Sequence, residues 1–202
     1  ITGERLAANL DLTDVQAIPT AVAIDRTSGN ANFTVTFDGT ATAATTDSIA
    51  VNISNSSNAG TLTIDGVETV NLVSTDDPAG ALVVNEFQLD AAATAGGSAV
   101  LNISGDGDLT VAATDAVTIN NSADANVTVN PSALATTITH TGSGSLTVGT
   151  ANATRTVTAS GTGALTFTSG TGVETVTGGS GNDRFVMNGN LASTDTITGG
   201  DG

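Results

Sequence analysis

Short runs in which apolar and polar residues alternate recur from one end of the chain to the other. A period of two places successive side chains on opposite faces of a β-strand, whereas the period of about 3.6 residues typical of an amphipathic helix is almost absent. Turn-forming Gly, Asn, Asp and Ser bound each run. The pattern predicts an all-β chain of many short strands, the clearest at residues 33–37, 49–53, 62–64, 82–84, 101–103, 109–111, 117–119, 127–129, 146–148 and 165–167.

The spacing of these runs suits two architectures, an antiparallel sandwich and a solenoid in which each run forms one side of a parallel coil. Asn188-Gly189 is the only hairpin dipeptide of the Asn-Gly type, and aromatic residues make up 2% of the chain, too few for a wide sandwich core. We therefore predict a right-handed parallel β-helix with a narrow interior of Val, Ile, Leu and Ala. Its expected strand starts, roughly 8 to 11 residues apart, are Leu109, Val117, Val127, Ile138, Leu146, Val157, Leu165 and Val173.

A local duplication supports the repeat architecture. The pentapeptide Gly-Val-Glu-Thr-Val occurs at 66–70 and at 172–176, and its valines are three residues apart, so they cannot both face inward on one straight strand. We predict a corner after the first valine, Val67 or Val173, and a new strand from the second. Glu68 and Glu174 then lie at corners, either as solvated charges or as ligands of a cation.

Two segments break the alternation. Residues 3–10 and 85–95 have the composition of one or two helical turns, or of loops that leave and rejoin the coil. The sequence therefore suggests three parts without independently folding domains: an irregular solenoid over 1–100, regular coils over 101–177, and a distinct motif from 178 to 202.

Charge narrows the partners. The 202-residue chain carries 20 acidic side chains and four Lys or Arg, for a formal net charge of −16. Nucleic acids and anionic membranes need clustered basic residues, so the charge argues against both and favours a cation.

No run suits a signal peptide or a membrane span. The absence of cysteine fits a reducing cytosol or a secreted protein that is stabilised without disulfides. The chain starts at Ile1, without an initiator Met, and stops at Gly202 inside a motif, so we expect it to be a fragment of a longer protein.

Residues 178–186, Gly-Gly-Ser-Gly-Asn-Asp-Arg-Phe-Val, fit the nonapeptide G-G-x-G-x-D-x-U-x at every defined position. The glycines permit a tight turn whose carbonyl oxygens point at a common centre, and the Asp adds a carboxylate, so the loop suits Ca²⁺. Phe185 should belong to a short buried strand. Residues 195–202 read as the tail of one nonapeptide and the head of the next.

This motif resembles the calcium-binding repeats of RTX (repeats-in-toxin) proteins, over about the last 25 residues. The resemblance implies a C-terminal β-roll with ions between successive turns, Ca²⁺ as cofactor, export by a type I system and folding triggered by Ca²⁺ outside the cell. Only one nonapeptide is complete, so the main array is expected beyond Gly202. Carried onto this sequence, the resemblance gives as metal-site residues Gly178, Gly179, Gly181, Asn182, Asp183, Asp195, Gly199, Gly200 and Asp201.

The Thr-, Ala- and Val-rich body, for example 127–134 and 163–167, resembles the β-helical part of bacterial RTX-type surface-layer proteins of the Caulobacter kind. That resemblance implies a secreted, non-enzymatic protein of the cell surface that packs against identical copies in a two-dimensional lattice, with surface polysaccharide contacted through another region. The alternative is a stalk or binding module of a large RTX adhesin. An accessory RTX domain of an enzyme ranks third.

Other acidic pairs on turns are further candidate calcium ligands. Asp106 and Asp108 lie two residues apart on a Gly-rich turn before a predicted strand. Asp76 and Asp77, and Asp65 beside the Gly66 corner, are comparable. Asx-rich turns of this kind also form without any metal.

Enzyme chemistry finds little support. His140 is the single histidine, there is no cysteine, and no H-E-x-x-H or G-x-S-x-G pattern is present. Strand alternation places His140 on the face of Ile138, as a partly buried residue at the end of a coil.

Threonine pairs of the form Thr-x-Thr resemble the flat face of ice-binding solenoids. Such a face needs the pairs at one fixed period, and here their spacing along the chain is irregular, so the sequence favours β-propensity as their reason. The pairs noted are at 34–36, 61–63, 137–139, 156–158, 166–168 and 196–198.

Overall fold

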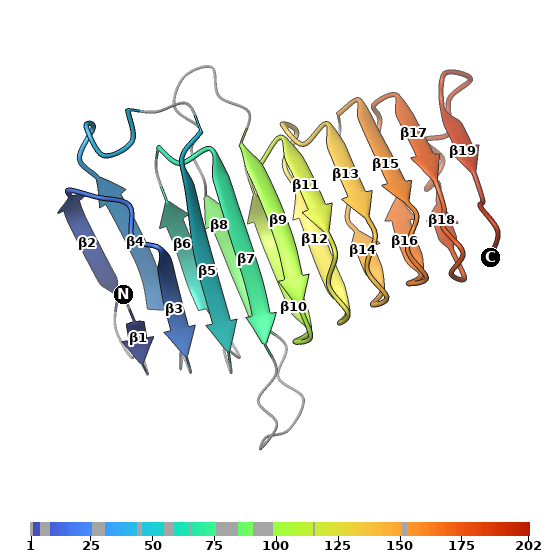
Figure 1. Ribbon diagram of the computed structural model, residues 1–202. Coiled ribbons are helices and arrows are strands. Elements are labelled where there is room, and N and C mark those ends of the chain that lie inside the picture. Colours follow the sequence, from blue (N-terminus) through green and yellow to red (C-terminus); the bar gives the residue numbers. More distant parts are fainter. Residues whose placement is uncertain are drawn as a thin grey trace.

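The chain forms a parallel β-solenoid, described by a computed structural model over residues 2–4, 9–25, 31–43, 46–54, 59–64, 66–75, 85–90, 99–114, 116–150 and 153–202. Each coil contributes one strand to each of two sheets, and every pairing between neighbouring strands is parallel (Figure 1). The N- and C-terminal ends lie at opposite ends of the stack. No helix in the described residues is long and apolar enough to cross a lipid bilayer.

Odd- and even-numbered strands form different sheets. Sheet A contains β1 Thr2–Glu4, β3 Ala21–Asp25, β5 Ser48–Ser54, β7 Thr69–Thr75, β9 Val100–Gly105, β11 Thr118–Asn121, β13 Thr137–His140, β15 Arg155–Ala159, β17 Glu174–Thr177 and β19 Thr196–Thr198. Sheet B contains β2 Leu10–Val15, β4 Ala31–Phe37, β6 Ala59–Ile64, β8 Asn85–Asp90, β10 Leu109–Thr114, β12 Val127–Pro131, β14 Leu146–Val148, β16 Leu165–Thr168 and β18 Arg184–Val186.

The core lies between the sheets and is built from columns of like residues. In sheet B, the register aligns one apolar residue from each successive coil, and all are at most 1% exposed. Each buried side chain of this size stabilises the fold by about 1.5–3 kcal/mol relative to an exposed one. This column, which we call the leucine column, contains Leu109, Val127, Leu146 and Leu165.

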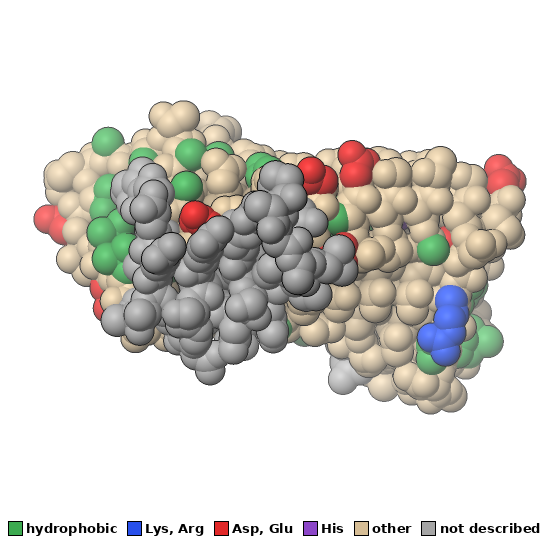
Figure 2. Space-filling view, turned by 90° about the horizontal axis from the view of Figure 1, so that it is seen from below, with side chains coloured by type: hydrophobic (Ala, Val, Ile, Leu, Met, Phe, Trp, Pro, Cys, Tyr) green, Lys and Arg blue, Asp and Glu red, His purple; other side chains and the backbone are tan. Residues whose placement is uncertain are grey.

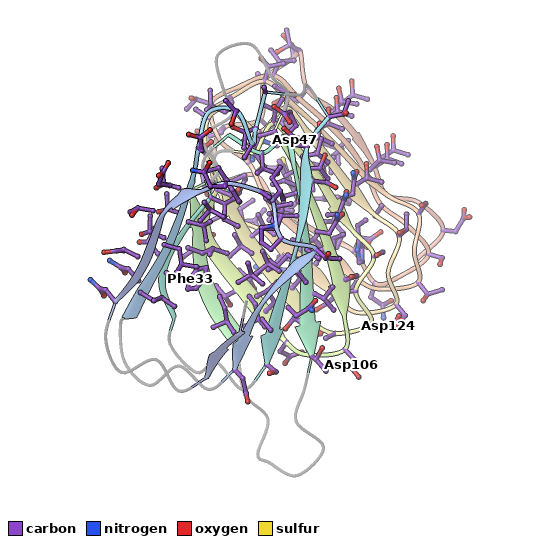
Figure 3. The ribbon with its side chains drawn as sticks, turned by 60° about the vertical axis from the view of Figure 1, so that its left-hand side comes forward. Phe33, Asp47, Asp106 and Asp124 are labelled. Atoms are coloured by element: carbon purple, nitrogen blue, oxygen red, sulfur yellow. The ribbon has the colours of Figure 1, made fainter. Side chains whose placement is uncertain are left out.

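The strands meet at two edges. Sheet A strands run into sheet B strands at the lower edge of Figure 1, and sheet B strands return to sheet A at the upper edge. Figure 3 shows Asp106 and Asp124 at the lower edge and Asp47 at the opposite one. The lower-edge corners 122–126, 141–145 and 160–164 all have five residues, whereas upper-edge connections range from three residues at 115–117 to ten at 38–47.

The expected strands are confirmed wherever they fall on described residues, with small shifts. β11 begins at Thr118 and β17 at Glu174, one residue after the predicted starts. Residues 82–84 lie outside the described residues. The helical prediction is wrong for residues 85–90, which form β8, because pairing with β6 and β10 overrides the local propensity. Thr2–Glu4 is also a strand, and residues 5–8 and 91–95 lie outside the described part.

The two copies of the pentapeptide adopt different conformations. In the first, Val67 is buried and Glu68 is partly exposed; in the second, Val173 is 41% exposed and Glu174 is buried. Gly66 has a positive φ of 82°, and Gly172 does not. β7 begins at Thr69 and β17 at Glu174, so both strands start before the second valine of the repeat. Glu174 therefore lies in a strand instead of at the predicted corner, and its interpretation as a solvated charge is wrong.

Candidate metal centre

The nonapeptide lies at the lower edge, where its Gly-x-Gly turn is one of a stack of similar turns. The amide of Ser180 donates to the carbonyl of Gly161 at 3.3 Å, and the amide of Asp201 donates to that of Gly179 at 2.9 Å. The turns therefore superpose coil upon coil. Their sequences are Gly105-Asp106-Gly107, Ala123-Asp124-Ala125, Gly142-Ser143-Gly144, Gly161-Thr162-Gly163, Gly179-Ser180-Gly181 and Gly200-Asp201-Gly202.

Small residues are required in this stack because the backbones pack directly on one another. A Cβ atom at position 181 would lie 2.6 Å from the carbonyl oxygen of Gly163, and one at 179 would lie 2.7 Å from that of Gly161. At positions 144 and 163 the Cβ atom would overlap the carbonyl of the preceding coil. The glycines thus bring carbonyl oxygens together at the lower edge, which is the first requirement of an oxygen-lined cation site.

Asp183 occupies a position that the other coils give to a buried apolar residue. β16 and β18 pair Thr166 with Arg184 and Phe167 with Phe185, so extending the register by one residue places Asp183 beside Leu165. Asp183 therefore ends the leucine column with a carboxylate. Burying a charged carboxylate costs several kcal/mol unless its oxygens are satisfied.

Only one of the two oxygens of Asp183 has a protein partner. Oδ1 accepts the backbone N–H of Leu165 at 2.8 Å, whereas Oδ2 is buried and has no hydrogen-bond partner among the residues that the structure describes. Gly178 lies beside this oxygen. A Cβ atom at position 178 would overlap both Oδ2 of Asp183 and the carbonyl oxygen of Gly199, so the two oxygens converge on the space that the glycine leaves.

The structure brings two oxygens to this cradle, one from the Asp183 carboxylate and one from the Gly199 carbonyl. Hard oxygen donors of this kind suit Ca²⁺, which takes about 6–8 oxygens, often from backbone carbonyls. Within the described residues, no cluster of three or more His, Cys, Asp or Glu side chains is placed to hold a metal. A site at Asp183 would thus depend on carbonyls, and the residues present fit Ca²⁺.

The other residues predicted from the motif are spread over this corner and beyond it. Asn182 and Asp201 are exposed, and Gly200 has a positive φ of 81°. Asp195 directly precedes β19, at the upper edge, whereas the nonapeptide corner lies at the lower edge. The structure therefore does not bring Asp195 to the nonapeptide corner. Its Oδ2 accepts the N–H of Ala192 at 2.7 Å and its Oδ1 that of Glu174 at 3.0 Å. These two hydrogen bonds, the first being the stronger influence, lower the pKa of Asp195.

The acidic pair at 106 and 108 is divided between two roles. Asp106 is exposed at the lower edge, in the same stack position as Asp124 and Asp201 (Figure 3). Asp108 accepts the backbone N–H of Asn126 at 2.9 Å and its side-chain amide at 3.4 Å. The carboxylate of Asp108 thus caps the next coil without a metal. Asp65, Asp76 and Asp77 lie outside the described residues.

Glu68, the other corner glutamate, also has a capping role. Its Oε2 accepts the backbone N–H of Asp47 at 2.8 Å on the neighbouring coil. A carboxylate that bonds the first free N–H of a strand satisfies a donor that would otherwise be lost. The geometry therefore accounts for Glu68 through the backbone alone.

His140 is completely buried, on the face of Ile138 as predicted. The prediction that it is only partly buried is wrong. Its Nδ1 lies 3.1 Å from Nδ2 of Asn121, whose Oδ1 accepts the N–H of Ala123. Asn121 is therefore the donor and Nδ1 the acceptor, which leaves the proton on Nε2. Burial lowers the pKa of His140, against smaller opposing effects of its hydrogen bonds and of the charge on Asp183.

A buried charge pair was missed by the sequence reasoning. Arg155 on β15 and Glu174 on β17 are paired in register, and both are at most 2% exposed. Glu174 Oε1 accepts the N–H of Gly170 at 2.7 Å, while Oε2 and the three guanidinium nitrogens have no hydrogen-bond partner in the described part of the chain. Burial lowers the pKa of Arg155 and raises that of Glu174. The available sequence signal was Arg155 itself, a single basic residue at an inward position of a Thr-rich strand.

The repeated turn was also missed, although the sequence contains a signal for it. A small-x-small turn followed two residues later by an apolar-Thr-apolar run occurs on four successive coils, at 105–111, 123–129, 142–148 and 161–167. The nonapeptide differs from these by placing Asp183 and Arg184 where the others have an apolar residue and Thr. Aligning these segments would have shown that the motif continues the body of the solenoid.

Comparison of the chain with protein-family models, with curated proteins and with solved structures finds no match.

Proposed function

We propose that this chain is a calcium-stabilised structural module of a secreted bacterial surface-layer protein of the RTX type, which packs against copies of itself. The observation that carries the calcium part is the cradle at Gly178, where an unpartnered, buried oxygen of Asp183 and the carbonyl of Gly199 converge. Two oxygens that face each other without a donor repel, and a cation between them removes both the repulsion and the cost of burial.

Asp183, Gly199 and the carbonyls of the stacked glycine turns would hold the ion, between the corner 178–183 and the turn 199–202. Binding there would favour the folded over the unfolded chain, because an unfolded chain does not assemble the same oxygens. Weak extracellular calcium sites have dissociation constants of about 10⁻⁴–10⁻³ M, so folding would respond to external Ca²⁺.

The charge distribution supports an ion-dependent fold. Figure 2, which looks onto the lower edge, shows separated carboxylates in red and a single small group of basic atoms in blue. At that edge Asp106, Asp124 and Asp201 follow the same stack position without a basic residue between them. Exposed like charges destabilise the compact state through repulsion, and divalent cations screen it.

The assembly part of the proposal is supported by the shape of the stack. Parallel coils that contact only their neighbours make an extended rod, which can pack side by side with copies of itself. The same rod also suits the alternative, a stalk of an RTX adhesin, because the chain enters at one end and leaves at the other (Figure 1).

Calcium titration of the folded chain tests the site. We expect isothermal titration calorimetry to detect Ca²⁺ binding and circular dichroism to show less β-structure in EGTA. Asp183→Asn should abolish binding, and Asp124→Asn, an exposed lower-edge carboxylate, should retain it. Equal folding at zero calcium together with unchanged binding by Asp183→Asn would contradict the site.

Electron microscopy of negatively stained protein after addition of millimolar Ca²⁺ tests the assembly. Ordered sheets support a surface-layer module, and dispersed rods support the adhesin stalk. Because calcium binding is measured separately, failure of assembly and failure of the calcium site can be distinguished.

A further inference from the structure

Threonines on the outer face of sheet A form a regular two-column array. β13, β15, β17 and β19 each present two outward threonines, separated by one inward residue. The strands pair without any shift, so the threonines lie side by side in both columns. We call this set the threonine array: Thr137, Thr156, Thr175 and Thr196 in one column, and Thr139, Thr158, Thr177 and Thr198 in the other.

The array explains why the period looked irregular in the sequence. The pairs at 34–36, 61–63 and 166–168 lie on sheet B strands β4, β6 and β16. Pairs taken in chain order therefore belong to two different sheets, and their spacing is regular only within one of them. Within sheet A the separations are 19, 19 and 21 residues, and the longer one is absorbed by the upper-edge connection 187–195. The expectation that the pairs fail to register as a plane is therefore wrong for these four strands.

The array is free to bind something outside the protein. All of its threonines are exposed or half-exposed, and none of their hydroxyl groups makes a hydrogen bond with the described part of the chain. Thr118 on β11 pairs with Thr137 and extends the first column to a fifth strand. The hydroxyl group of threonine both donates and accepts hydrogen bonds, so the array offers both kinds of partner at each point.

Its geometry is that of a rigid grid. Adjacent strands lie about 4.8 Å apart, and alternate residues along a strand are about 6.7 Å apart. Threonine is stiff at χ1 because it is β-branched, so hydroxyl and methyl groups repeat in fixed directions. The first column, over five strands, is about 19 Å long. A prism surface of hexagonal ice presents oxygen rows with a similar rectangular repeat.

Charge selects among the partners that such a grid could bind. The outward positions of the four strands carry no charged residue, although the chain as a whole has a formal net charge of −16. A neutral grid has no attraction for nucleic acid, cations or anionic lipid. It complements a neutral partner that offers both donors and acceptors at regular intervals, and crystalline water meets this description.

We infer that the threonine array is an ice-binding surface, which orders water through rows of hydroxyl groups and the methyl groups between them. Water bridging between fixed hydroxyls costs little entropy for each molecule when the positions match a lattice that already exists. The inference does not rest on the calcium site, because no oxygen of the cradle belongs to a threonine of the array. Thr177 and Thr198 directly precede Gly178 and Gly199 of the cradle, so the array is measured with Ca²⁺ present.

Ice-affinity partitioning and thermal hysteresis, measured on the folded chain in Ca²⁺, test this inference. We expect the protein to enter slowly grown ice and to shape its crystals, whereas serum albumin is excluded. Thr158→Tyr places a bulky ring at the centre of the array and should reduce incorporation to the level of albumin. Thr147→Tyr, at an outward position of β14 on sheet B, should leave it unchanged.

The outcomes separate the alternatives. Exclusion of the unmodified protein from ice, or equal losses in Thr158→Tyr and Thr147→Tyr, overturns the inference. Sedimentation velocity identifies a second copy as the occupant: a dimer that Thr158→Tyr converts to monomer, without ice incorporation, also overturns it. If circular dichroism shows that Thr158→Tyr is unfolded, Thr196→Tyr on the terminal strand β19 takes its place, with the same expected loss.

Discussion

Arg155 and Glu174 are in-register neighbours on successive coils, and both side chains are buried in the solenoid. The pair lies where the two copies of the pentapeptide differ in conformation. Glu174 turns inward where Arg155 precedes it in the stack, whereas Glu68, which Ala99 and Asp47 flank in sheet A, remains partly exposed. The buried glutamate thus occurs in the copy of the repeat that has an arginine on the neighbouring coil.

Removing one member of this pair should strongly destabilise the fold. Glu174→Leu leaves Arg155 buried without a compensating charge, and we expect a loss of about 3–5 kcal/mol. The matched change Glu68→Leu, in the same local sequence, removes only a capping hydrogen bond and should cost about 1 kcal/mol. Urea unfolding monitored by circular dichroism measures both. Similar midpoints for the two variants would show that Arg155 does not depend on Glu174.

Acid should weaken the fold through His140. Burial depresses the pKa of this residue in the folded chain below its unfolded value of about 6.5, so the unfolded state binds the proton more readily. Stability is therefore complete above that pH and falls as the pH is lowered through 6.5 towards the depressed value. His140→Gln should lack this part of the slope. The unfolding midpoint of both proteins is measured from about pH 7.5 to about pH 5, a range that spans the unfolded pKa of histidine.

The cradle beside Asp183 can be closed by one methyl group. Gly178→Ala would place a Cβ atom in the space between Asp183 Oδ2 and the carbonyl of Gly199, so we expect it to abolish calcium binding in calorimetry. Gly39→Ala is the control, because nothing lies within 4 Å of its added Cβ atom. Retained affinity in Gly178→Ala would place the ion elsewhere.

An asparagine ladder outside sheet A should contribute to stability. Asn102 donates from Nδ2 to Oδ1 of Asn71 at 2.8 Å and accepts from Asn120 at 2.9 Å. Asn102→Ala breaks both bonds and should cost about 1–3 kcal/mol at roughly 0.5–1.5 kcal/mol each. Asn52→Ala, at an outward position of β5 with no such bond, should cost less. Thermal unfolding compares the two, and equal shifts would mean that the ladder adds nothing.

Local pattern was enough to predict strands but not which face each corner residue takes. Alternation located β5 and β12 because their inward residues are all apolar. It failed at β8, where the charged and amide residues Glu86 and Gln88 suggested a helix and only the flanking strands decide the outcome. Parallel pairing is a long-range property, so the composition of one segment cannot reveal it.

The candidate site shows the same limit. The nonapeptide identified Asp183, but the reason for its importance is the leucine column, which exists only when the coils are stacked. Likewise, Asp108 and Asp183 both precede strands in Gly-rich segments, and the difference lies in their partners: Asn126 satisfies Asp108, while one oxygen of Asp183 has none.

The contrast between the two edges determines where this molecule can accept new sequence. At the lower edge, the stacked glycine turns leave no room for a longer corner between β11 and β16, although the connection 76–84 on the same edge has nine residues; upper-edge connections run from three residues at 115–117 to ten at 38–47. Peptides grafted at the upper edge would all project from one side, about 4.8 Å apart from coil to coil. The upper edge of the solenoid can therefore display inserted peptides in a row, repeated at the spacing of the coils.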